Sequence, residues 1–256
     1  MANRNAVQRR KAILEWLDES GVVTVEQLSA LLATSEVTIR KDLAALEAEG
    51  LLLRRRGGAV SVPQTPQPRP LASVLQQRIA AAAVACIKPQ GRIIIDCGST
   101  TAAMIPHLVR RSDLVVMTNS LAIAKALSEL ERPPTLLMSG GTWDPHSGSF
   151  QGRLAEQSLH SYDFDQLFIG ADGIDGERGT TSFNELLRLS QVMAEVSRQV
   201  IVLAEADKWG RRIPNLELPW SRIDCLITDD RLSPSARSAL AEQGVGLVCV
   251  PDKQED

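Results

Sequence analysis

The strongest constraint on the fold is an alternation of strand-like and helix-like segments from residue 71 onward. Short apolar runs rich in β-branched residues lie at 92–96, 114–118, 135–138, 166–170, 200–205, 225–228 and 245–250. Helix-like apolar patterns accompany them at 75–87, 102–109, 121–130, 154–161, 184–197 and 234–243. Strands that alternate with helices form mostly parallel sheets with helices on both faces. The sequence therefore predicts an α/β domain over residues 71–256.

Polar residues stand at the carboxyl ends of five of these strands, where parallel sheets bind ligands. One polar strand end is typical of helix capping, whereas five together predict a polar pocket. A lysine can bind phosphate as a point charge, and carboxylate and amide groups can bond hydroxyls. The candidate ligand-binding residues are Asp96, Gly98, Ser99, Thr100, Thr101, Thr118, Asn119, Gly140, Gly141, Asp172, Glu185 and Lys208.

The loop at 96–101 is the candidate phosphate cradle within this set. It joins a predicted strand to a predicted helix start, where backbone N–H groups and the helix dipole favour an anion. Gly98 lets the backbone approach closely, and three consecutive hydroxyl residues add neutral donors. The loop has no Walker lysine. An ordinary helix cap after a buried strand remains an alternative, because Ser and Thr favour that position.

The first sixty residues show three helix-like patterns. The first covers 7–19, and the second opens at Thr24, whose spacing from Gln27 is that of a capping box. The third follows Ser35, a favoured N-cap residue, after a turn at 33–34. The apolar residues expected in the core are Ile13, Leu14, Leu17, Val25, Leu28, Leu31, Leu32, Ile39, Leu43 and Leu46.

Two helices joined by a tight turn and followed by a short strand and a basic turn predict a winged helix-turn-helix. The N-terminal half of the second of these helices enters the major groove, where an arginine fork can pair with guanine. Arginines in the wing suit phosphate contacts. The candidate DNA contacts are Ser35, Glu36, Thr38, Arg40, Lys41, Arg54, Arg55 and Arg56. A three-helix dimerisation domain with solvated basic residues is the alternative.

Composition narrows the remaining possibilities. Residues 1–60 carry nine Lys/Arg and eight Asp/Glu, so only local clusters can favour nucleic acid. No apolar run is long enough to span a bilayer, and the charged N-terminus does not resemble a secretion signal. Four scattered cysteines predict free thiols in the cytoplasm, and three histidines without ligand spacing predict no metal. We expect no cofactor.

A proline-rich segment separates the two parts of the chain. Residues 61–70 read SVPQTPQPRP, with four prolines in ten residues, which favours an extended spacer. The predicted organisation is a DNA-binding domain at 1–60, a linker at 61–70 and an α/β domain at 71–256.

The segment from Arg10 to Val60, and above all SEVTIRKDL at 35–43, resembles the DNA-binding module of the DeoR family of bacterial repressors. The order of Asp96-x-Gly98-Ser99-Thr100, Thr118-Asn119, Gly140-Gly141 and Gly170-x-Asp172-Gly173 resembles the family's sensor domain. Glu185 and Lys208-x-Gly210 continue that order. The resemblance implies a fold related to ribose-5-phosphate isomerase. It also implies a repressor that binds double-stranded operator DNA and a sugar or polyol phosphate effector, as a dimer or tetramer.

Within the family, TNSLAIAKALSEL, GSFQGRLAE, GADGID, TSFNE and KWGRRIPN look most like the branch that regulates sorbitol (glucitol) operons. This implies sorbitol 6-phosphate as effector. Two other hypotheses stay open. One is a sugar-phosphate isomerase with a DNA-binding domain, in which Asp172, Glu185 or Lys208 would move protons. The other is an interaction module without a ligand, which five polar strand ends argue against. The DNA module favours a sensor, and no residue is predicted to be catalytic.

Overall fold

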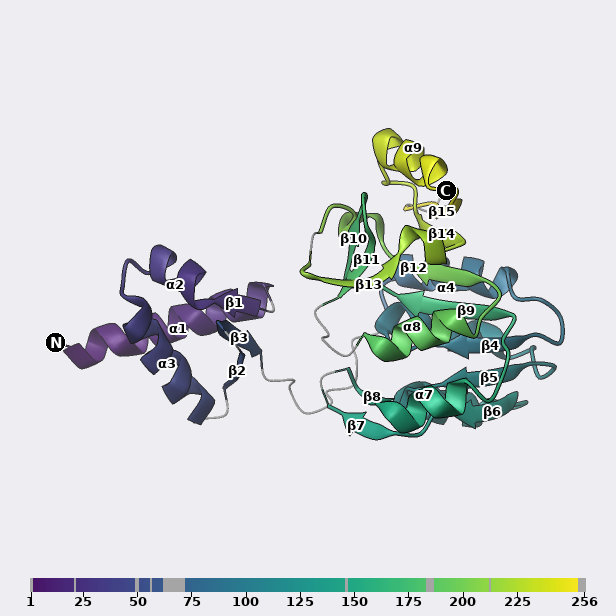
Figure 1. The fold of residues 1–256 in the computed structure, drawn as a ribbon, viewed down its shortest axis with the longest axis horizontal. Coiled ribbons are helices and arrows are strands. Elements are labelled where there is room, and N and C mark those ends of the chain that lie inside the picture. Colours follow the sequence, from purple (N-terminus) through teal and green to yellow (C-terminus); the bar gives the residue numbers. More distant parts are fainter. Residues whose placement is uncertain are drawn as a thin grey trace. The chain divides into compact units, whose positions relative to one another are not determined.

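The computed structural model describes residues 2–20, 22–48, 51–55, 57–61, 72–145, 147–182, 187–211 and 213–252. The chain divides into two compact units, Met1–Pro68 and Arg69–Asp256 (Figure 1). Most of the predicted linker lies outside the described residues, and Ser61 ends a strand of the first unit.

The N-terminal unit is a winged helix-turn-helix. Its elements are α1 (Ala2–Ser20), β1 (Val22–Thr24), α2 (Val25–Leu31), α3 (Glu36–Ala48), β2 (Leu52–Arg55) and β3 (Gly58–Ser61). The strands form an antiparallel sheet in the order β1-β3-β2, so the wing packs against the short strand between the first two helices. Gly58 is required there, because a Cβ atom would lie 2.1 Å from the Val23 carbonyl oxygen.

Local capping signals place these helices. Thr24 and Gln27 form the predicted capping box at the start of α2. The core contains most of the expected residues, but the prediction for Leu31 is wrong, because its side chain is 47% exposed. Helix α2 ends at Leu31, and Leu32 packs against the core in its place.

The second unit is built on a seven-stranded parallel sheet, as predicted. In spatial order the strands are β15 (Gly246–Val250), β14 (Cys225–Asp229), β12 (Val200–Leu203), β9 (Gln166–Gly170), β4 (Arg92–Ile95), β5 (Val115–Thr118) and β6 (Thr135–Met138). Each neighbouring pair is parallel, so all seven carboxyl ends lie at one edge.

Helices cover both faces of this sheet (Figure 1). One face packs against α4 (Val74–Ala85), α5 (Ser99–Ala102), a 3₁₀ turn η1 (Ile105–Leu108) and α6 (Leu121–Ser128). The other packs against α7 (Arg153–Leu159), α8 (Arg188–Glu195) and α9 (Pro234–Glu242). The alternation of β4 illustrates the arrangement, since Ile93 and Ile95 join the first core and Ile94 the second. In the described part of the chain, no helix is long and apolar enough to cross a membrane.

Several elements differ from the sequence prediction. The helix predicted at 102–109 begins at Ser99 and gives way to the 3₁₀ turn η1, where Pro106 has no N–H to continue an α-helix. A hairpin of β7 (Thr142–Asp144) and β8 (Ser149–Gln151) follows β6. A small antiparallel sheet contains β10 (Gly173–Asp175), β11 (Gly179–Ser182) and β13 (Asn215–Pro219). Their strands are three to five residues long, too short to leave a periodic signal.

Candidate functional site

The order of the strands defines a topological switch point between β4 and β9. From β4 the chain moves outward through β5 to β6, then returns to β9 on the other side and moves away through β12 and β14 to β15. Ligands of open α/β sheets bind beyond the carboxyl ends of the strands at such a point. The five strands with predicted polar ends, β12, β9, β4, β5 and β6, are neighbours in this sheet.

Asp96 follows β4 directly at the switch point. Its side chain is 7% exposed and accepts a hydrogen bond of 2.8 Å from Asn119 Nδ2. Asn119 Oδ1 in turn accepts from the backbone N–H of Cys97. Burial raises the pKa of the Asp96 carboxyl to about 6, and the negative charge of Asp172 adds to the rise. The carboxyl group therefore exchanges its proton near neutral pH.

The hydroxyl residues after Asp96 lie in different environments. Thr101 is fully buried, and its Oγ1 donates to the carbonyl oxygen of Asp96 at 2.8 Å. Thr100 is buried, whereas Ser99 is exposed. The N-cap residue of α5 is Gly98, and no side chain caps this helix. The loop is therefore not the ordinary Ser/Thr cap of the alternative prediction, and Thr101 holds the loop together.

The candidate residues after the flanking strands also differ in their surroundings. The Thr118 hydroxyl is fully buried and accepts from the backbone N–H of Ser120, so it shapes the chain. Gly141 has φ of 112°, and a Cβ atom there would lie 2.5 Å from the Gln151 carbonyl oxygen. Gly140 also has positive φ but faces open space.

Asp172 and Lys208 approach the switch point from β9 and from the segment after β12. Asp172 is exposed and accepts a hydrogen bond of 2.9 Å from Ser182 Oγ. Lys208 Nζ donates to the carbonyl oxygen of Ala171 at 2.6 Å, which places the ammonium group beside the residue that precedes Asp172. Glu185 lies outside the described residues.

Glu217 is a carboxyl group of this region that the sequence analysis missed. The pairing of β11 with β13 shifts between Thr180 and Thr181, which face Leu218 and Leu216, so Glu217 is the extra residue of a β-bulge. Both Glu217 and Leu218 are buried, against the usual alternation. Ser190 Oγ donates to Glu217 Oε1 at 3.0 Å. Nothing in the sequence signalled the bulge.

The environment of Glu217 connects it to the switch point. Burial raises its pKa to about 8, and the negative charges of Asp96 and Asp172 raise it further, against a hydrogen bond from Ser190. At neutral pH its carboxyl group is therefore protonated. Among the described residues, no group of three or more His, Cys, Asp or Glu side chains has the geometry of a metal site, and all four cysteines are free thiols.

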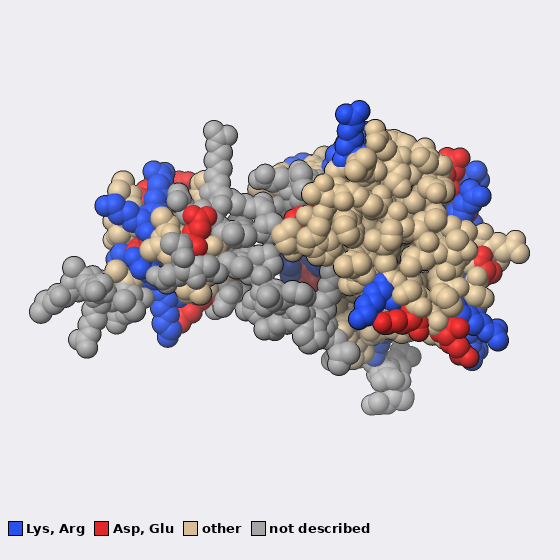
Figure 2. Space-filling view, turned by 90° about the horizontal axis from the view of Figure 1, so that it is seen from below, with Lys and Arg blue, Asp and Glu red and all other residues tan. Residues whose placement is uncertain are grey.

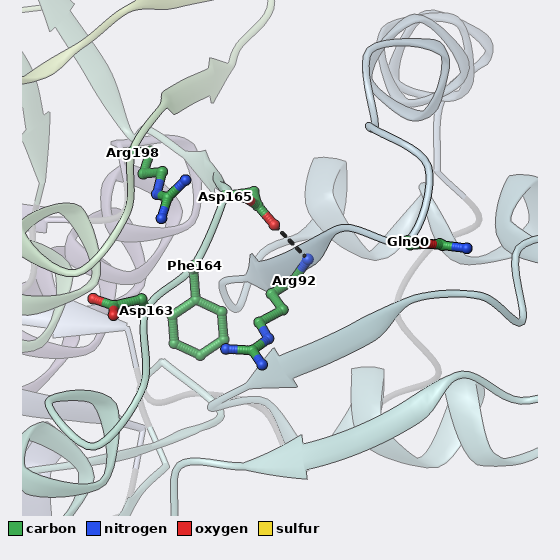
Figure 3. A pocket seen from close by; sticks show the side chains of 6 residues that line it. All are labelled: Gln90, Arg92, Asp163, Phe164, Asp165 and Arg198. Carbon is green, nitrogen blue, oxygen red and sulfur yellow. Dashed lines mark hydrogen bonds between the residues drawn. The ribbon is translucent and has the colours of Figure 1, made fainter.

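The opposite edge of the sheet has a different character. A hollow of about 250 Å³ lies at the amino ends of β4 and β9, lined by Gln90, Arg92, Asp163, Phe164, Asp165 and Arg198 (Figure 3). Asp165 accepts from the backbone N–H of Arg92 at 2.9 Å. None of the predicted ligand-binding residues lines this hollow.

In the N-terminal unit, α3 presents a polar face opposite its buried stripe. Ile39, Leu43 and Leu46 are buried, whereas Glu36, Arg40 and Lys41 are exposed. Ser35 caps the helix by accepting from the backbone N–H of Thr38. Arg40 Nη2 lies 2.7 Å from Glu36 Oε2, an exposed ion pair that contributes at most about 1 kcal/mol. The guanidinium group can therefore leave Glu36 for a base edge at little cost.

A buried carboxylate fixes α3 against α1. Asp42 is 3% exposed and pairs with Arg9 Nε at 2.5 Å and with Arg10 Nε at 3.1 Å. These charge-assisted contacts tie α3 to α1. On the face in Figure 2, basic side chains of this unit are interspersed with acidic ones, in agreement with its balanced charge.

Two of the predicted wing arginines lie on a described strand. Arg54 and Arg55 belong to β2, and Arg55 pairs with Gly58 on β3. Gly57, just before β3, has φ of 86°. Arg56 lies outside the described residues.

A winged helix-turn-helix followed by an α/β domain with polar groups at its switch point defines a DNA-binding regulator with a sensor domain. Comparison with known families agrees. Residues 9–65 match the DeoR-like helix-turn-helix domain, and residues 73–230 match the DeoR C-terminal sensor domain. The chain belongs to the DeoR family of transcriptional regulators.

Curated relatives are similar over nearly their whole length. The chain is 38% identical to a putative aga operon transcriptional repressor of Escherichia coli O157:H7, covering 95% of this chain and 93% of that protein. It is 34% identical to the uncharacterized regulator YulB of Bacillus subtilis, covering 95% and 96%. It is 32% identical to the repressor GlcR of Bacillus subtilis, covering 94% and 95%.

Among solved structures, ribose 5-phosphate isomerase A of Methanocaldococcus jannaschii is 19% identical, with a TM-score of 0.40. The match covers 54% of this chain and 55% of that one.

Proposed function

We propose that this chain represses an operon for sugar or polyol use and that a phosphorylated sugar or polyol controls it from the carboxyl edge of the sheet. The observation that carries the proposal is the meeting of five polar strand ends around the β4/β9 switch point. The N-terminal unit binds double-stranded operator DNA through α3 and the wing. The regulator acts in the cytoplasm as a homo-oligomer, which suits palindromic half-sites, and needs no cofactor.

The chemistry at this edge supports a polyol phosphate. Ser99 and the first turn of α5 offer neutral donors to a phosphate, and Lys208 brings a cation to the neighbouring strand end. Asp96, Asn119 and Asp172 supply groups that pair with hydroxyls. We propose sorbitol 6-phosphate as the first compound to test, on the resemblance of the sequence strings. The relatives' names, among them an aga operon repressor, make other hexose phosphates part of the same test.

The mechanism is a linkage between two binding equilibria. Effector binding at the switch point shifts the conformation of the oligomer, and operator affinity changes by the same coupling free energy. A typical coupling of about 1–3 kcal/mol changes operator affinity about 5–150-fold.

An isomerase with a DNA-binding domain is the second candidate. The raised pKa values of Asp96 and Glu217 favour it, because a general base works best with a pKa near the operating pH. The same groups serve a binding pocket, and the curated relatives above are named as transcriptional repressors and regulators. The full chain should therefore show no turnover of ribose 5-phosphate or of hexose phosphates in a coupled assay.

The direct test is operator affinity at fixed salt, measured by fluorescence anisotropy with and without each compound. We expect one hexitol or hexose phosphate to change the operator dissociation constant at least fivefold. No change with any of them would overturn the effector model.

Arg40→Ala tests the DNA interface in the same assay. Loss of a bidentate base contact should weaken operator binding by about 1–3 kcal/mol and leave binding to random DNA nearly unchanged. Lys11→Ala is the matched control, because Lys11 is an exposed basic residue of α1 that pairs with Glu15. Equal loss on both DNAs would make Arg40 a phosphate contact.

A further inference from the structure

The hairpin of β7 and β8 lies across the carboxyl ends of β5 and β6. The backbone N–H of Phe150 donates to the carbonyl oxygen of Asn119 at 2.8 Å, and Ser149 forms a β-bridge with Ser120. Gly141, after β6, packs closely against the Gln151 carbonyl. The hairpin is therefore fixed to the residue whose side chain holds Asp96.

Side chains on one face of this hairpin form a hydrogen-bond chain. Gln151 Nε2 lies 2.8 Å from Ser149 Oγ, which lies 2.7 Å from Ser147 Oγ. Ser147 Oγ donates to Asp144 Oδ2 at 2.7 Å. Phe150 and Trp143 make an aromatic contact of their own, with ring centroids 5.4 Å apart.

The donor and acceptor in each of these hydrogen bonds follow from the number of protons that the side chains carry. A carboxylate only accepts, and each serine hydroxyl has one proton to donate. Since Ser147 gives its proton to Asp144, the proton between the two serines comes from Ser149. Ser149 can then only accept from Gln151, which must present its NH₂ group. The carboxylate of Asp144 thus determines the orientation of the Gln151 amide.

This orientation leaves one acceptor without a donor. Gln151 is 7% exposed, and its Oε1 is buried without a hydrogen-bond partner among the described residues. Flipping the amide would not help, because Ser149 would then need a second proton. Buried polar atoms nearly always have partners, so an orphan beside a binding site indicates a donor supplied by a ligand.

We propose that Gln151 Oε1 accepts a hydrogen bond from a hydroxyl or amino group on the carbon chain of the effector. Gln151 is then a specificity-determining residue, and the β7–β8 hairpin forms one wall of the effector site. The inference rests on the proposed function, because it takes the bound molecule to be a sugar or polyol phosphate at the carboxyl edge. A buried neutral acceptor favours effectors whose carbon chain has a hydrogen-bond donor opposite Gln151 Oε1 over effectors that have none at that position.

Gln151→Met in the full chain tests the proposal, because methionine keeps the length of the side chain and removes both polar atoms. Calorimetric titrations use inorganic phosphate, sorbitol 6-phosphate, glucose 6-phosphate and glucosamine 6-phosphate. We expect the variant to bind the tightest of the three organic phosphates at least tenfold more weakly and inorganic phosphate within twofold of wild type. Gln157→Met, on the exposed face of α7, is the control and should match wild type.

Ser149→Ala removes the partner that orients the amide. Its affinity for the same organic phosphate should fall between those of wild type and Gln151→Met. Wild-type affinity of Gln151→Met for all three organic phosphates would overturn the proposal.

The thermal midpoint without ligand separates this inference from the proposed function. Since Gln151→Met removes an unpaired acceptor together with one hydrogen bond, its midpoint should stay within about 2 °C of wild type. A fall of more than about 4 °C would show that both amide atoms are satisfied in the free protein and would overturn the inference. If wild type binds none of the four compounds, the proposed effector class is wrong, and the midpoint still decides whether Gln151 Oε1 lacks a partner.

Discussion

Two buried aspartates at the carboxyl edge of the same sheet show how two strands of one sheet can give a carboxyl group opposite chemistry. Asp229 ends β14 and is fully buried, and Asp96 follows β4 and is 7% exposed. Asp229 Oδ1 lies 2.6 Å from Arg231 Nε, and its Oδ2 accepts from the backbone N–H of Ala206. Hydrogen bonding and the charge of Arg231 hold the pKa of Asp229 below its usual range despite burial.

Asp96 has the opposite balance. Neutral groups, the Asn119 amide and the Cys97 backbone, are the hydrogen-bond partners that offset its burial. Its pKa rises to about 6, and Glu217 nearby rises to about 8. A buried carboxyl with its own cation stabilises the fold, whereas one left with neutral partners at a switch point is available for function.

The largest expected effect is on the free energy of unfolding, and it distinguishes the structural role of Asp229 from the functional role of Asp96. Asp229→Ala should lower the free energy of unfolding by about 3 kcal/mol, because it leaves the buried Ala206 N–H unpaired and removes the nearest of the carboxylates that pair with Arg231. Asp96→Asn keeps the side-chain shape and should cost less than about 1 kcal/mol. Urea unfolding at neutral pH measures both variants. A cost for Asp96→Asn equal to that of Asp229→Ala would make Asp96 a structural residue.

Sequence predicted those parts of the molecule that depend on local signals. The capping box at Thr24 and the buried stripe of α3 placed the DNA-binding helices, and apolar runs placed the strands of the parallel sheet. The carboxyl ends of parallel strands lie at the same edge of the sheet, so the polar residues that follow the strands lie at that edge too. Leu31 was misplaced because Leu32, four residues after the buried Leu28, packs against the core in its place.

The rest of the site depends on tertiary structure. Glu217 reaches the switch point through a β-bulge in a five-residue strand, and no periodic pattern marks a bulge. Gln151 became a candidate only when the hairpin and its hydrogen-bond chain were seen, since a glutamine near a turn has no signal of its own. Thr101 and Thr118 are predicted ligand-binding residues, and the hydrogen bonds that their buried hydroxyls form with backbone groups of the protein have no signal in the sequence.

Glu217→Gln tests whether the buried Glu217 carboxyl is protonated, through the pH dependence of stability. The folded pKa of Glu217 lies above its unfolded value, so its contribution to stability is complete at low pH and is lost as pH rises toward 8. The glutamine variant has no such loss. Its stability relative to wild type should therefore increase by about 2 kcal/mol between pH 6 and pH 8, measured by urea unfolding. A difference that does not change with pH would contradict the proton on Glu217.

Asn119→Ala should affect stability less than Asp229→Ala and Glu217→Gln do. It removes the hydrogen bonds to Asp96 and to the Cys97 N–H, and should cost about 1 kcal/mol in the free energy of unfolding. Because Asp96 then loses its positioning partner, the effector response should weaken while operator binding without effector stays intact. An unfolding midpoint and an effector response both equal to wild type would show that Asn119 does not hold this loop.

We propose that ligand binding at the β4/β9 switch point controls DNA binding. The operator dissociation constants of wild type and Asp96→Asn at fixed salt, with and without a saturating hexitol or hexose phosphate, test this. Wild type should change about 5–150-fold on ligand addition, whereas the variant should bind the unliganded operator normally and change less than twofold. An unaltered response in the variant, or no response in wild type to any of these phosphates, would contradict the account.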